Sequence, residues 1–123
     1  MLLFVVSMTA LTSCKKTSTE SIVGKWECTA ASSTEDGVTQ SITYLNGMIW
    51  EFNTDGTVTS SLNADTFNGT ATYVKANNLL TITYTDDDEI ENNMYTIKEL
   101  TSSKLLLEKT NGNRIITYEF KRI

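Results

Sequence analysis

Residues 114–122 read Arg-Ile-Ile-Thr-Tyr-Glu-Phe-Lys-Arg, and large apolar side chains alternate there with polar ones. Ile116, Tyr118 and Phe120 occupy every second position, and threonine, glutamate and lysine stand beside them. Successive side chains of a β-strand point to opposite faces. The stretch therefore predicts a strand with one face buried and the other in water.

The same alternation recurs along the chain, and no long segment carries apolar residues at helical spacing. We predict eight strands, at residues 25–31, 47–53, 57–62, 69–75, 79–84, 93–100, 104–109 and 114–122. The connections are mostly short, so neighbours in sequence should pair antiparallel. The predicted fold is all-β, an eight-stranded antiparallel up-and-down barrel, and a two-layer sandwich is the alternative.

The phase of each strand predicts which side chains face inward. Asn53-Thr54-Asp55-Gly56 is a hairpin signal between two of the strands. Cys28 is expected to be a packed, inert thiol. The predicted inward set is Trp26, Cys28, Ala30, Met48, Trp50, Phe52, Val58, Leu62, Ala71, Tyr73, Leu80, Ile82, Tyr84, Tyr95, Ile97, Leu105, Leu107, Ile116, Tyr118, Phe120 and Arg122.

The N-terminus carries a different signal. Residues 1–10 are apolar and uncharged, and they are shorter than the about 20 residues that span a bilayer. The following Leu11-Thr12-Ser13-Cys14 resembles a lipobox, which implies cleavage before Cys14 and acylation of that cysteine. This divides the chain into a signal peptide (1–13), a lipidated tether (14–20) and one domain (21–123). The alternative is a buried first strand near residues 2–6 and an ordinary Cys14 thiol.

Composition argues against several classes of function. The formal net charge is −5 and the chain has no histidine. An acidic chain does not suit a nucleic-acid partner, and most catalytic and zinc sites use histidine. We expect no enzyme activity, no cofactor and no metal. The acidic run at residues 86–91 is interpreted as a solvated hairpin tip rather than a weak cation site.

Gly24-Lys25-Trp26 opens the first predicted strand, and residues 118–122 close the last. This pairing resembles the lipocalins, and the whole mature chain is similar to short lipocalin-like lipoproteins of Gram-negative bacteria. The resemblance implies that Trp26 packs beneath Arg122 at the closed end of a barrel (calycin fold), with Gly24 admitting a tight turn. A guanidinium over an indole is a cation–π contact.

Two functions follow from this interpretation. The first is a membrane-anchored module that binds a small apolar or neutral ligand. The second is an envelope lipoprotein with a filled barrel that contacts protein or glycan partners through its outer surface. We expect a monomer, anchored in the outer membrane and facing the periplasm, with residues 32–46 as a lid. The candidate ligand-lining residues are Tyr44, Met48, Trp50, Leu62, Tyr73, Tyr84, Tyr95 and Tyr118.

Overall fold

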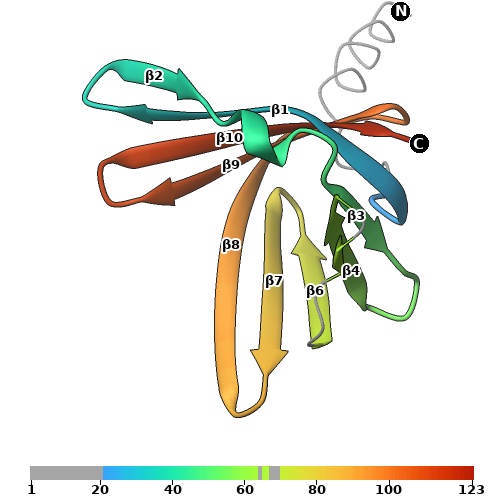
Figure 1. Ribbon diagram of the computed structural model, residues 1–123. Coiled ribbons are helices and arrows are strands. Elements are labelled where there is room, and N and C mark those ends of the chain that lie inside the picture. Colours follow the sequence, from blue (N-terminus) through green and yellow to red (C-terminus); the bar gives the residue numbers. More distant parts are fainter. Residues whose placement is uncertain (1–20, 64, 67–69) are drawn as a thin grey trace, which may run out of the picture.

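The computed structural model describes residues 21–63, 65–66 and 70–123 (Figure 1). The all-β antiparallel fold is confirmed in them, as one curled sheet with a single 3-10 turn, η2 (Thr43–Leu45). The strands are β1 (Gly24–Glu35), β2 (Val38–Ser41), β3 (Ile49–Phe52), β4 (Val58–Leu62), β5 (Asp65–Thr66), β6 (Thr70–Ala76), β7 (Leu79–Asp86), β8 (Glu89–Leu100), β9 (Lys104–Asn111) and β10 (Arg114–Arg122).

The predicted count of eight strands is wrong, because the sheet has ten. All eight predicted strands are present, and β2 and β5 are additional. Strand β2 forms because Asp36-Gly37, with φ of 53° and 79°, turns the chain back onto β1. Asp-Gly is a strong signal for a two-residue hairpin. The segment 32–46 that was expected to form a lid therefore contains the end of β1, strand β2 and the η2 turn.

In the described residues the sheet curls into a half-barrel that is consistent with the predicted lipocalin-like fold. Its order is β5-β4-β3-β1-β10-β9-β8-β7-β6, with β2 paired to β1, so the first long strand meets the last as expected. Among the described residues, the chain just before β4 meets β6 in one isolated bridge, Thr57↔Thr72, beside a hydrogen bond from the Tyr73 N–H to the Gly56 carbonyl. The C-terminal end of β4 pairs with β5 instead. Little of the β4 edge therefore remains for β6 to pair with.

The core lies on the inner face of this curled sheet, and most of the predicted inward residues are buried there. Ala30 is the exception, because it is exposed while Ala31 is buried. The pairing of β1 with β10 shifts between Cys28 and Ala30. A bulge of this kind adds a residue and reverses the phase of everything after it. Sequence alternation alone cannot reveal such a reversal.

Strands β8 and β9 separate part-way along their length. Their ladder begins at Leu100↔Leu105 and ends at Thr96↔Glu108. Beyond it β8 stays with β7 as far as Asp86↔Glu89, whereas β9 stays with β10 as far as Asn111↔Arg114. We call the place of separation the fork, and the two hairpins the β7–β8 arm and the β9–β10 arm. The arms point in different directions in Figure 1.

Candidate functional site

The closed end of the sheet is organised around Trp26, which is fully buried. The guanidinium carbon of Arg122 lies 4.2 Å from the centre of the Trp26 ring, and the indole N–H donates to the Ile22 carbonyl at 2.8 Å. Gly24 has φ of 132°, and a Cβ there would lie 2.6 Å from Arg122 Nη1. The structure thus brings Gly24, Trp26 and Arg122 together, and Gly24 provides the space that the guanidinium occupies.

Arg122 also holds three backbone carbonyls, which the sequence did not indicate. It donates from Nη1 to Val23 at 2.8 Å, from Nη2 to Ser21 at 2.9 Å and from Nε to Ser102 at 2.7 Å. The side chain therefore ties the segment before β1 and the β8–β9 turn to the last strand. These are structural contacts, and each of the three guanidinium nitrogens makes one of them.

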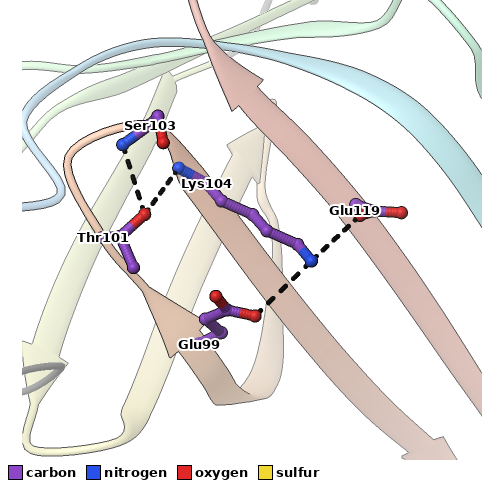
Figure 2. Close-up of polar contacts among 5 residues, drawn as sticks. All are labelled: Glu99, Thr101, Ser103, Lys104 and Glu119. Atoms are coloured by element: carbon purple, nitrogen blue, oxygen red, sulfur yellow. Dashed lines mark hydrogen bonds and ion pairs between the residues drawn. The ribbon is translucent and has the colours of Figure 1, made fainter.

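Figure 2 shows how the β8–β9 turn is fixed for this contact. The Thr101 hydroxyl accepts hydrogen bonds from the backbone N–H groups of Ser103 at 3.3 Å and Lys104 at 3.0 Å. The Lys104 ammonium lies 3.5 Å from Glu99 and 3.2 Å from Glu119, and these carboxylates raise the pKa of Lys104. The ion pairs are exposed, so we assign them little stability.

The predicted ligand-lining residues separate into different environments. Met48, Trp50 and Tyr95 are buried in the core, and Leu62 is half-buried beside it. Tyr73 has a structural role, because its hydroxyl donates to the Asn53 carbonyl at 2.8 Å. Tyr44, on η2, is exposed.

Tyr84, Tyr95 and Tyr118 form the inner surface near the fork, and we call them the tyrosine tier. The rings of Tyr95 and Tyr118 lie edge to face at 5.8 Å. Burial is the main cause that raises the pKa of all three phenols, and the Glu91 carboxylate adds to it at Tyr84 and Tyr95. The phenols are therefore protonated at neutral pH and carry a hydroxyl donor.

Trp50 lies directly beneath this tier. Its ring is 5.7 Å from that of Tyr95 and 6.4 Å from that of Tyr118. The indole Nε1 is buried and has no hydrogen-bond partner among the described residues. A buried donor without an acceptor is costly, and it calls for an explanation such as a water or a bound molecule.

Two open grooves lie on the hairpins beyond the tier, and the second of them includes the tier residue Tyr84. A groove of about 490 Å³ runs over the β1–β2 hairpin, and its lining residues are Ser33, Glu35, Asp36, Val38, Gln40, Ile42, Tyr44 and Arg114. A groove of about 560 Å³ lies on the β7–β8 arm, lined by Tyr84, Asp86, Glu89, Ile90 and Glu91. Of the predicted lining set, Tyr44 and Tyr84 border these grooves. Tyr44 also interacts electrostatically with Tyr118 and raises its pKa.

The remaining predicted features are local. The acidic run at 86–91 is the exposed end of the β7–β8 hairpin, with Asp87 at φ 57° in its turn. In the described part of the chain, no group of three or more His, Cys, Asp or Glu residues is placed to hold a metal ion. Cys28 is a free, buried thiol, and its burial raises its pKa. Cys14 and the whole 1–20 segment lie outside the described residues.

Comparison with known families decides where this architecture belongs. The model of the lipocalin-like domain matches residues 22–107, which include the strands from β1 into β9. The chain belongs to the lipocalin-like family. No curated protein matches the chain. Within the lipocalin-like family the fold is generally one for binding or carrying small ligands.

One surface of this lipocalin-like protein was not expected from the sequence. On the outer face of β6–β8 the pairing sets Val74 beside Thr81 and Thr81 beside Met94, and Val74 and Met94 are 67% and 55% exposed. Their neighbours on that face include Thr72, Thr83 and Asn92, so the patch is uncharged. The outer positions of β1 and β10 instead carry the ion pair Lys121–Glu27.

Among the described residues, no helix is long and apolar enough to cross a lipid bilayer.

Proposed function

We propose that this lipocalin-like protein binds a small, largely apolar ligand at the fork, with the ligand body resting on the tyrosine tier. The observation that carries the proposal is the tier itself. Tyr84 borders an open groove of about 560 Å³, and Trp50, whose ring packs against Tyr95 and Tyr118, has a buried indole N–H without a partner among the described residues. Pockets that combine apolar walls with a few polar groups are typical small-molecule sites. The phenols give such a ligand hydrogen-bond donors beside apolar surface.

The interior below the tier is not part of the proposed site. Phe52, Leu105 and Phe120 are essentially fully buried, and the Trp50 and Phe120 rings lie 4.9 Å apart. A ligand therefore binds across the fork rather than deep inside a calyx. This placement suits a chain whose inner face is filled by its own side chains.

A fluorescence titration with phenylnaphthylamine, a neutral aromatic probe, tests this site. The protein is the mature chain, residues 14–123, carrying Cys14→Ser. We expect Tyr118→Leu to weaken probe binding about three- to tenfold, because an aromatic contact is worth about 0.5–1.5 kcal/mol beyond its area. Tyr73→Leu removes a tyrosine of similar exposure away from the fork, and it should leave the affinity unchanged. No binding by the wild-type chain would refute the proposal.

We also propose that the mature protein is a monomer anchored through Cys14 in the outer membrane, facing the periplasm. Support comes from the lipobox-like Leu11-Thr12-Ser13-Cys14 and the polar segment after it. Two or more acyl chains hold a protein on a bilayer stably, whereas one does not.

Labelled palmitate should enter the chain in its bacterial host, and Cys14→Ser should abolish the label. Cys28→Ser is the matched control, because Cys28 is buried in the folded domain and should not be acylated. Label retained by Cys14→Ser would remove the anchor from the proposal.

A second candidate function, contact with a protein or glycan partner through the outer surface, is favoured by the uncharged patch around Val74 and Met94. Exposed apolar surface of this kind is a common feature of interaction sites. The response to Tyr118→Leu separates the two candidates, since phenylnaphthylamine bound at the outer patch around Val74 and Met94 would not be affected by a change at the fork.

A further inference from the structure

Lys109 stands at the fork, on the β9–β10 arm. It follows the buried Leu105 and Leu107 at every second position of β9, so its side chain points to the inner face of the sheet. The β8–β9 ladder has ended one residue earlier, at Glu108. Its Nζ donates to Asn93 Oδ1 across the fork and lies 5.7 Å from the centre of the Tyr95 ring.

The ammonium of Lys109 lacks a carboxylate partner within the described residues. The lysines and arginine found in ion pairs there are Lys104, Lys121 and Arg114, at 3.2–3.6 Å from their carboxylates. An ammonium has three donors, and the Asn93 amide oxygen takes one. Lys109 therefore keeps hydrogen-bonding capacity on a half-buried, aromatic-walled surface, where an anionic acceptor would be held more strongly than in open water.

We infer that the fork binds a ligand with an anionic oxygen head, such as a carboxylate, which accepts a hydrogen bond from Lys109 while its apolar body lies on the tyrosine tier. The inference rests on the proposed function and specifies its ligand class. The nearby phenols of Tyr95 and Tyr118 are protonated donors, so they add no negative charge to repel the head.

The charges of the two arms support this orientation. The β7–β8 arm presents Asp86, Glu89 and Glu91 along its groove. On the inner face of the β9–β10 arm, Arg114 is paired with Glu35 at 3.6 Å, and Lys109 is the cation there without a carboxylate partner among the described residues. The carboxylates repel an anion that approaches along their own arm. Screening limits this repulsion to about 8 Å at physiological salt. An anionic head is therefore directed to the β9–β10 side of the fork.

Two probes with the same ring system test the inference in the mature chain with Cys14→Ser. Phenylnaphthylamine is neutral, and anilinonaphthalene sulfonate adds one anionic group. Lys109→Met should weaken binding of the sulfonate about tenfold, which corresponds to one charge-assisted hydrogen bond, and change binding of the neutral probe less than about twofold. Lys98→Met, at an exposed position of β8, is the control and should change neither affinity.

A second variant keeps Lys109 but gives its ammonium a carboxylate partner within the protein. Asn93→Asp places a carboxylate of the same size against Lys109 Nζ, so we expect the sulfonate to bind about tenfold more weakly and the neutral probe to bind as before. Circular dichroism establishes that each variant is folded. If both variants bind the neutral probe and also bind the sulfonate as tightly as the wild-type chain does, this inference is overturned while the proposed function stands. Failure of the wild-type chain to bind either probe would overturn it together with the proposed function.

Discussion

Replacing Trp26 with alanine is expected to lower the free energy of unfolding by about 3–5 kcal/mol, the usual range for removing a large aromatic side chain from a core. Trp26 is fully buried, so removal of its side chain leaves a cavity between the surrounding strands. The same change removes the indole donor to the Ile22 carbonyl and the surface beneath Arg122. Urea denaturation followed by circular dichroism measures the loss.

Trp26→Phe divides this effect into its parts. Phenylalanine retains an apolar ring but has no N–H, so the Ile22 carbonyl loses its donor, at a cost of about 1–3 kcal/mol. Total stability of a domain is only about 5–15 kcal/mol, and the alanine variant should therefore unfold at a much lower urea concentration. A Trp26→Ala loss below about 1 kcal/mol would show that the closed end does not stabilise the sheet.

The strands themselves were predictable because alternation is a local property. Leu80 and Ile82 on β7, and Trp50 and Phe52 on β3, are buried in the phase that the sequence predicts. Ala30 was assigned to the wrong face because the bulge in β1 is a backbone event between Cys28 and Ala30. Strand β2 was missed although Asp36-Gly37 carries the same turn signal as Asp55-Gly56.

The candidate site was predicted only in part, because it depends on where strands stop pairing. The sequence indicated an inward aromatic set, and Tyr84, Tyr95 and Tyr118 belong to it. It gave no sign of the fork, since the end of the ladder at Thr96↔Glu108 depends on the directions of two long hairpins. Alternation in the sequence alone therefore does not indicate Lys109 as a binding residue.

The barrel was inferred from strand number and short connections, and both are also compatible with the half-barrel that the described residues form. Closure requires β4 and β6 to form a ladder, yet Ser61 and Leu62 of β4 pair with β5. Closure also removes exposed strand edges. Here the remaining contact, the Thr57↔Thr72 bridge, is reinforced by the neighbouring turn, where hydrogen bonds from Thr57 lower the pKa of the Asp55 carboxyl.

Arg122→Met should cost about 2–4 kcal/mol of unfolding free energy, although the residue is the second from the end of the chain. The guanidinium donates to the carbonyls of Ser21, Val23 and Ser102, which belong to two segments on either side of β10. Methionine keeps an unbranched apolar stem, is shorter than arginine and has no donor. The loss therefore measures the polar contacts and the cation–π contact with Trp26.

Arg122→Lys should lose most of the same free energy, because an ammonium is a compact charge and cannot match the planar fork of donors that faces separate carbonyls. Lys121→Met is the control at the adjacent position. Its ammonium makes one exposed ion pair, 3.5 Å from Glu27, so its loss should stay below about 1 kcal/mol. Full stability of Arg122→Lys would mean that positive charge alone suffices and that the three carbonyl contacts contribute little. A loss in both the lysine and methionine variants, with none in Lys121→Met, would assign the stabilisation to the geometry of the guanidinium.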